Sequence, residues 1–238
     1  MDVRQLGEEE VERPSPAVPV APVPAAPPVA VPPARPATSR AKRALDLVVV
    51  IVTAPVVLVL GLVTALVVLV TSGRPVLFAH ERVGLGGRTF RMYKFRTMRP
   101  EAEHLLHADP LLLQEYIDNG YKLPAEVDRR ITRVGRFLRR SSLDELPQWL
   151  NVLAGHMSVV GPRPVVPAEI ENYGDQRDAY LSVRPGITGA WQVNGRSTVD
   201  YPERVALDAE YVRSWSLRRD LAILLRTPLA VVTARGAH

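Results

Sequence analysis

Two adjacent carboxylates are the residues of this sequence with the clearest potential for chemistry. Asp144 and Glu145 lie in the stretch SSLDELPQWLN, which covers residues 141 to 151. Ser142, followed by Glu145 three residues later, also fits a helix capping box, which is a purely structural motif. Adjacent acids can instead bind a cation or attack an electrophile. The local pattern favours capping, so the rest of the chain has to decide between the two uses.

Pro147 positions the two acids relative to the helix that follows them. A helix that begins at Leu143 would meet the ring of Pro147, which has no N–H, in its second turn. A helix that begins at Pro147 suits the proline better, because the N–H groups of a first turn have no intrahelical partner. Both carboxylates would then lie in the turn before the helix, close to the positive end of its dipole.

Two arginines downstream of the acids are held by neighbouring prolines. Arg163 lies between two prolines, and the second of them biases the Arg163 backbone away from the α region. Arg184 precedes a Pro-Gly pair in a second glycine-rich loop. A guanidinium on a fixed backbone can bind phosphate through two parallel hydrogen bonds. Both arginines are therefore predicted to bind an anion, and the motif NGRS adds Arg196 in what would otherwise be an ordinary turn.

Lys94 and Arg96 are predicted to act together from a strand. The alternation over residues 75–78 and 89–95 predicts two short strands, and the GLGG motif at 84–87 predicts the turn between them. Side chains two residues apart on a strand share a face, so these two cations could contact one phosphate. The motif GLGG lacks the flanking strand, helix and acid of a dinucleotide site.

A long apolar segment predicts membrane association. Residues 47–70 contain no charged side chain, and as a straight helix they would be about 36 Å long, enough to cross a bilayer. Basic residues flank both ends, so the positive-inside rule draws both ends to the cytoplasmic side. Pro55 removes one hydrogen bond near the middle of the segment. The residues alone leave open a kinked spanning helix and a re-entrant hairpin.

The remaining composition limits the function. The chain has no cysteine, which excludes disulfides, zinc–thiolate sites and cysteine catalysis. A net charge of +5 favours anionic partners. Residues 1–39 are rich in proline, alanine and valine without a helical or strand period, so we expect a disordered tail. Residues 128–164 are basic and amphipathic, which is typical of helices at a lipid interface.

With these motifs in view, the chain resembles the bacterial sugar transferases, which are monotopic polyprenyl-phosphate glycosyl-1-phosphate transferases. The likeness covers about residues 40–233, and the length between KFRTM and RITRVG is similar to that in the exopolysaccharide branch. The motifs occur in the family's order: KRALDL, ERVG, YKFRTM, RITRVGRFLRRSSLDELPQ, MSVVGPRP, RPGITGAWQVNGRS and LRRDLAILLRT.

The resemblance implies a reaction and roles for residues. A sugar 1-phosphate would move from a nucleotide diphosphate sugar to a polyprenyl phosphate such as undecaprenyl phosphate, with Mg²⁺ as cofactor. Asp144 would be the nucleophile that forms an aspartyl phospho-sugar intermediate, and Glu145 would be a base or a metal ligand. Both acids would bind Mg²⁺, and nearby cations would hold Asp144 ionised. The phosphates and the nucleotide would contact Lys94, Arg96, Arg163, Arg184 and Arg196.

The resemblance also implies an architecture. We expect a mainly α fold with short β elements (α+β), interfacial amphipathic helices and a break at Pro55 that makes the membrane segment re-entrant. The regions would be the tail at 1–39, a re-entrant membrane hairpin at 40–72 and a cytosolic, membrane-associated catalytic domain at 73–238. The site would face the cytoplasm at the bacterial inner membrane. A homo-oligomer stays open.

A different class of function stays open as an alternative. The protein could be a non-catalytic membrane scaffold of a polysaccharide assembly complex, although a scaffold has no need of adjacent acids together with proline-flanked arginines. A nucleic-acid binder is excluded by the membrane segment and by the lack of an aromatic stacking platform.

The sequence departs from the family pattern in three places. His80 stands where glutamine is frequent before ERVG, and His156 replaces an acid in the motif GDMS. No role is assigned to either histidine. Trp149 and Leu150 invert the usual Leu-Trp order, which we interpret as a matter of helix packing.

Overall fold

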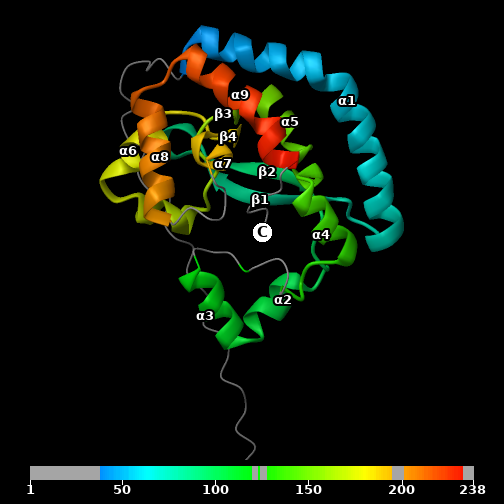
Figure 1. Ribbon diagram of the computed structural model, residues 1–238. Coiled ribbons are helices and arrows are strands. Elements are labelled where there is room, and N and C mark those ends of the chain that lie inside the picture. The colour runs from blue at the N-terminus through cyan, green and yellow to red at the C-terminus, as the bar shows by residue number, and fades with distance from the viewer. Residues whose placement is uncertain (1–37, 120–122, 124–127, 195–200, 233–238) are drawn as a thin grey trace, which may run out of the picture.

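The computed structural model describes residues 38–119, 123, 128–194 and 201–232. These residues form mostly helices with a few short strands, which confirms the expected mainly α fold (Figure 1). Nearly all of the proline-rich tail and Arg196 lie outside the described residues. The helices are α1 (Arg40–Ser72), α2 (Ala102–His107), α3 (Pro110–Asp118), α4 (Arg133–Arg140), α5 (Gln148–Leu153), α6 (Arg177–Leu181), α7 (Ala190–Val193), α8 (Tyr201–Arg213) and α9 (Leu217–Val232).

Short strands and 3-10 turns connect these helices. Strands β1 (Leu77–Val83) and β2 (Thr89–Phe95) form an antiparallel hairpin, with His80 opposite Met92. Strands β3 (Ser158–Val160) and β4 (Gly186–Thr188) pair in parallel. The 3-10 turns are η2 (Leu85–Gly87), η3 (Leu143–Glu145) and η4 (Pro167–Gln176). The motif GLGG therefore forms the turn between the strands of the hairpin, as predicted, whereas the first strand covers residues 77–83 and not the predicted 75–78.

Helix α1 is the apolar segment, and it is long and apolar enough to cross a membrane. Its middle is exposed: Ile51, Leu58 and Leu62 are 68%, 63% and 64% accessible. The helix continues through Pro55 and is visibly bent (Figure 1), so the predicted break is a bend within one helix. The Thr53 hydroxyl donates to the carbonyl of Val49 at 2.7 Å, one turn earlier in the helix.

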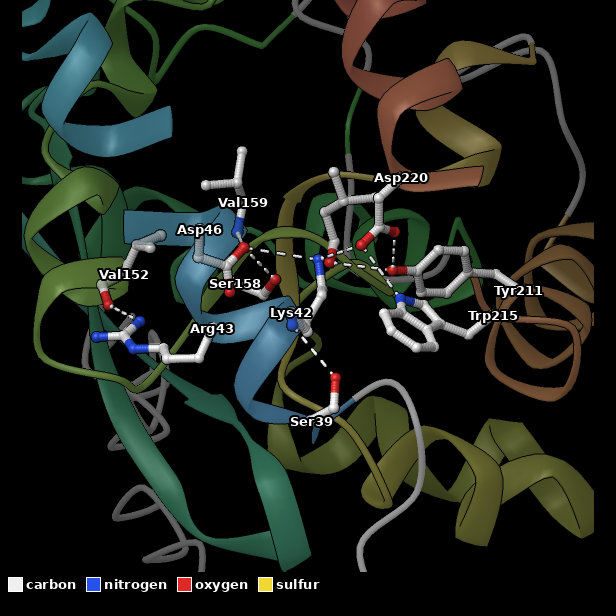
Figure 2. Close-up of polar contacts among 11 residues, drawn as sticks. Ser39, Lys42, Arg43, Asp46, Val152, Ser158, Val159, Tyr211, Trp215 and Asp220 are labelled. Carbon is white, nitrogen blue, oxygen red and sulfur yellow. Dashed lines mark hydrogen bonds and ion pairs between the residues drawn. The ribbon is translucent and has the colours of Figure 1, made fainter. Parts of the chain in front are cut away.

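Both ends of α1 pack against the same domain. The first end is held by a buried ionic network, in which Lys42 Nζ lies 2.9 Å from Asp220 Oδ2 and 3.5 Å from Asp46 Oδ1 (Figure 2). Asp46 also accepts hydrogen bonds from the Ser158 hydroxyl and the Val159 N–H, at 2.8 and 2.9 Å. This network fixes the start of α1 to β3 and α9.

The second end of α1 returns to the domain on the side of the β1–β2 hairpin. Val68 is fully buried and packs with Phe95 of β2 and Leu138 of α4. The buried guanidinium of Arg96 donates to the carbonyls of Ser72, Gly73 and Arg74, just past the last turn, where carbonyls need partners. The apolar helix is therefore attached at both ends and exposed between them.

Candidate active site

The acids lie in the turn that precedes α5. Glu145 is the last residue of the 3-10 turn η3, which is one turn long. Helix α5 begins at Gln148, directly after Pro147. Ser142 makes no capping bond with its side chain and has φ 56°, the one positive φ of a non-glycine residue in the described part of the chain. The capping-box interpretation is therefore wrong, and the helix begins at Gln148, one residue after the start predicted at Pro147. Left-handed backbone at a serine is uncommon and is often found at functional sites.

Lys94 joins the two carboxylates from β2. Its Nζ lies 2.7 Å from Glu145 Oε1 and 3.9 Å from Asp144 Oδ2. Asp144 is 5% exposed, whereas the Glu145 side chain is 35% accessible. One buried and one accessible carboxylate thus lie beside the same ammonium, while the predicted contact of Lys94 with a phosphate stays a prediction.

Burial dominates the ionisation of Asp144. Desolvation raises its pKa to about 6, while the Lys94 and Arg139 charges lower it and Glu145 raises it. The expectation that cations hold Asp144 ionised therefore needs correction, because burial outweighs them. At neutral pH a carboxyl with this pKa is still mainly the carboxylate that a nucleophile requires.

Arg139 is a member of the site that the sequence did not single out. Its Nε donates to the Thr97 hydroxyl at 3.0 Å. Burial lowers the Arg139 pKa, and Asp144 is the largest opposing influence. A Cβ at Gly135 would lie 2.0 Å from the Thr97 carbonyl, so only glycine lets α4 lie this close to Thr97. In the sequence, Arg139 is one of six arginines in a row of basic residues, and nothing there separates it from the others.

Side-chain contacts with backbone hold α5 in place. The fully buried Asn151 accepts from the Tyr93 N–H at 3.0 Å and donates to the Arg91 carbonyl at 2.7 Å, which pairs α5 with the outer edge of β2. At the end of α5, Arg43 of α1 donates to the last two carbonyls of the helix at 2.6 and 3.0 Å. Neither residue was predicted from the sequence, and both position the segment that carries the acids.

Arg163 lies in a separate cationic cluster. Its guanidinium carbon is 5.5 Å from the centroid of the Trp191 ring, and that of Arg204 is 5.0 Å from the same ring. Arg82, on β1, is electrostatically coupled to Arg163 and donates to the Pro164 carbonyl at 3.3 Å. Within the described residues, no hydrogen bond or ion pair joins the Arg163 side chain to the acids. The predicted phosphate contact of Arg163 therefore remains a prediction.

The other predicted cations are used differently. The Arg184 Nε donates to the Gly155 carbonyl at 2.7 Å, which ties two loops together. The guanidinium of Arg96 holds the end of α1 and does not join the ion pair of Lys94. The predicted contact of Lys94 and Arg96 with one phosphate thus finds no support, because the Lys94 ammonium contacts the acids and the Arg96 guanidinium contacts backbone carbonyls.

The structure shows the contacts of the residues at which the sequence departs from the family pattern. The His156 ring stacks on Phe90, with centroids 5.8 Å apart. Trp149 packs against the main core while Leu150 is 54% exposed, consistent with helix packing as the reason for the inverted pair. His80 accepts a hydrogen bond from Arg82, at 3.1 Å.

The comparisons identify the family. Residues 37–234 match the sequence model of the family described as bacterial sugar transferase. The chain belongs to the bacterial sugar transferase family. Over 171 residues it is 48% identical to an undecaprenyl-phosphate galactose phosphotransferase of Salmonella typhimurium, covering 70% of this chain and 35% of that protein. The predicted family, including its exopolysaccharide branch, is confirmed.

Two further relatives match over more of their own length. The exopolysaccharide production protein ExoY of Sinorhizobium fredii is 41% identical over 208 residues, covering 86% of this chain and 91% of that protein. A UDP-glucose:undecaprenyl-phosphate glucose-1-phosphate transferase of Caulobacter vibrioides is 40% identical over 212 residues, covering 86% and 74%. This chain therefore spans about a third of the Salmonella relative and nearly all of ExoY.

The two acids have the donor chemistry of a magnesium site that substrate phosphates and water would complete. Among the described residues no group of three or more potential ligands surrounds a common point, so the chain offers a pair of carboxylates. Mg²⁺ is usually held by one or two carboxylates together with substrate phosphates and water. Asp144 and Glu145 match that donor set in number and chemistry.

Proposed function

We propose that this protein transfers a sugar 1-phosphate from a nucleotide diphosphate sugar to a polyprenyl phosphate and releases nucleoside monophosphate. The observation that carries the proposal is that the Lys94 ammonium lies close to both the buried Asp144 and the accessible Glu145. Relatives named for galactose and glucose phosphate transfer to undecaprenyl phosphate support this reaction class. Such a transfer would be the first membrane step of exopolysaccharide or glycoconjugate synthesis.

The first half of the reaction uses Asp144 as nucleophile. Its carboxylate oxygen attacks the sugar-bearing phosphorus, a new P–O bond forms, and the bond to the nucleoside monophosphate breaks. Lys94 and Arg139 offset the negative charge that gathers as the acid meets the pyrophosphate. Held by Asp144, Glu145 and the pyrophosphate, Mg²⁺ would supply further charge neutralisation.

The second half returns Asp144 to its starting state. An oxygen of the polyprenyl phosphate attacks the same phosphorus, and the aspartyl P–O bond breaks to give a lipid-linked diphosphate sugar. Glu145 is suited to assist as a base because its carboxylate is accessible while Asp144 is buried. Two displacements at one phosphorus conserve the phosphate count, since each forms one P–O bond and breaks one.

The arrangement of α1 supports a re-entrant position at the cytoplasmic face of the inner membrane. Both ends of α1 are attached to the same domain, and its exposed middle is apolar. A helix that crossed the bilayer would separate its two ends by about 30 Å of hydrocarbon. A site beside both ends would meet a lipid substrate in the leaflet and a nucleotide sugar from the cytosol.

The reaction is tested by nucleoside monophosphate release. The full chain in vesicles that contain undecaprenyl phosphate should release UMP from UDP-glucose or UDP-galactose and transfer the labelled sugar phosphate to lipid. These two donors are the nucleotide sugars that occur in the names of relatives of this chain. Membrane binding without turnover of any nucleotide sugar in a wider panel would favour the non-catalytic scaffold.

The topology is tested by cysteine labelling, because the chain has no cysteine of its own. Cysteines introduced as Ser39→Cys and Ser72→Cys should both be shielded from an impermeant thiol reagent added outside the cell. Both should react after permeabilisation, which is the control for accessibility. Labelling of only one of the two positions from outside would establish a spanning helix. Pro55→Leu should move part of the population to that spanning form, since it restores the missing N–H.

A further inference from the structure

One face of the β1–β2 hairpin links the acids to the Arg163 cluster. In the antiparallel register, Phe78 lies opposite Lys94 and Arg82 lies opposite Phe90, with His80 between them on β1. Directly opposed residues share a face, as do residues two apart on a strand. Lys94 contacts the acids at one end of this face, and Arg82 is coupled to Arg163 at the other. His80 therefore lies between two cationic positions.

The hydrogen bond with Arg82 fixes which nitrogen of His80 carries the proton. Arg82 Nη2 lies 3.1 Å from His80 Nδ1. A guanidinium can only donate, so Nδ1 must accept and a neutral ring must carry its proton on Nε2. Among the described residues no acceptor is found for Nε2. His80 is half-buried, and Nε2 is not among the buried side-chain atoms that lack a partner. This N–H can therefore be offered to a ligand.

The surroundings keep the His80 ring neutral. Burial, followed by the charges of Arg82 and Lys94, lowers the pKa of His80 to about 4, against a smaller opposing effect of Glu81. A neutral imidazole can still donate one directed hydrogen bond. It does so without adding a third positive charge to a strand face that already carries two.

We propose that His80 binds a phosphoryl oxygen of the substrate through its Nε2–H, between Lys94 and Arg82. The inference rests on the proposed function, since it assigns a residue to the same site. Glutamine has the same two capacities: its amide oxygen can accept from Arg82 and its NH₂ can donate to the ligand. His80 is thus a substrate-binding residue with a neutral donor.

The phosphoryl oxygen could belong to either substrate. A nucleotide diphosphate sugar and a polyprenyl phosphate both present anionic phosphoryl oxygens to this face. The two half-reactions separate them, because release of nucleoside monophosphate without lipid uses the donor alone, and discharge of the labelled enzyme uses the lipid phosphate alone.

The test compares His80→Gln with His80→Leu in the full chain. Loss of one hydrogen bond to a charged group is expected to slow the affected half-reaction about 10- to 100-fold in His80→Leu. His80→Gln should stay within about threefold of the wild type. His107→Gln, at an exposed histidine of α2 whose side chain is 65% accessible, is the matched control and should change nothing. Thermal melting and vesicle binding verify that each variant is folded.

A slowed first half-reaction assigns the bond to the donor phosphate, and a slowed discharge assigns it to the lipid phosphate. Wild-type rates in both steps for His80→Leu overturn the proposal. A His80→Gln variant as slow as His80→Leu overturns the donor role.

The ratio of wild-type to His80→Gln rates should be constant from pH 6 to pH 8, because neither side chain titrates there. A ratio that follows a group near pH 6.5 would mean proton transfer by His80 instead.

Binding of magnesium pyrophosphate, measured by calorimetry, supplies a readout that needs no turnover. His80→Leu should bind this probe about 10-fold or more weakly, and His80→Gln should bind like the wild type. If no nucleotide sugar is turned over but this binding pattern holds, the proposed reaction fails and the His80 site stands. Equal binding by all three proteins, together with wild-type rates, removes the His80 site and leaves the reaction untouched.

Discussion

Asp144→Asn is expected to abolish essentially all turnover while the chain stays folded and membrane-bound. Asparagine is close to aspartate in shape but cannot attack phosphorus, so the first displacement has no nucleophile. A capping role would predict a loss of only a few tenths of a kcal/mol, because asparagine caps helices about as well as aspartate. The structure removes that alternative, since η3 has no side-chain cap and α5 begins only at Gln148.

A matched control exists in the same chain. Asp109 is an aspartate that does cap a helix: its Oδ1 accepts from the N–H groups of Leu111 and Leu112 at 3.1 Å. Asp109→Asn should therefore leave both melting temperature and turnover near their wild-type values. Asp144→Asn should also melt near the wild type, since the amide removes a buried charge whose desolvation raises the pKa of Asp144.

The covalent intermediate gives the most direct measurement. Wild-type enzyme with Mg²⁺ and labelled donor, but no lipid, should release up to one nucleoside monophosphate per site and retain the labelled sugar phosphate. Undecaprenyl phosphate should then discharge the label into lipid, and Asp144→Asn should never acquire it. If rapid quenching detects neither protein-bound label nor early release while lipid product forms at the normal rate, transfer is direct and Asp144 is not the nucleophile.

The parts of the site that follow local rules could be predicted from the sequence. Pro147 fixed the start of α5, because a proline tolerates only the first positions of a helix. Alternation and a glycine-rich turn indicated the hairpin that carries Lys94. The apolar segment was evident from its length, and residues 47–70 lie within the single helix Arg40–Ser72. In each case the determining interaction lies within a few residues of the chain.

Contacts between distant segments could not be predicted in the same way. Arg96 lies two residues after Lys94 and Arg139 lies shortly before Asp144 in the sequence. Arg96 nevertheless closes the end of α1, whereas Arg139 donates to Thr97 and interacts electrostatically with Asp144. Which carbonyl or carboxylate a guanidinium reaches depends on how α1, α4 and β2 pack. Asn151 gave no signal, because a single asparagine in a helix pattern does not reveal that it pairs with a strand edge. The raised pKa of Asp144 was not predicted for the same reason, since burial follows from packing.

Lys94→Met is expected to slow the first half-reaction at least about 100-fold. Methionine keeps much of the apolar stem and removes the ammonium that lies 2.7 Å from Glu145 and 3.9 Å from Asp144. The loss combines a charged hydrogen bond, about 1.5–3 kcal/mol, with the repulsion between two uncompensated carboxylates and an incoming pyrophosphate. Without Lys94 the pKa of Asp144 also rises further, because Lys94 is the main influence that lowers it.

Arg91→Met is the matched control for this variant, since Arg91 is an exposed cation on the same strand whose side chain takes no part in the ion pair. Release of nucleoside monophosphate in the first turnover, without lipid, should separate the two variants clearly. Lys94→Arg should recover part of the rate, because its guanidinium keeps the charge but places it at a different distance from the acids.

Lys94→Met with a wild-type first turnover and a slow discharge would show instead that Lys94 serves through Glu145 in the lipid step, since Glu145 accepts the shorter of its two contacts. Lys94→Met with wild-type rates in both steps would remove Lys94 from the catalytic site.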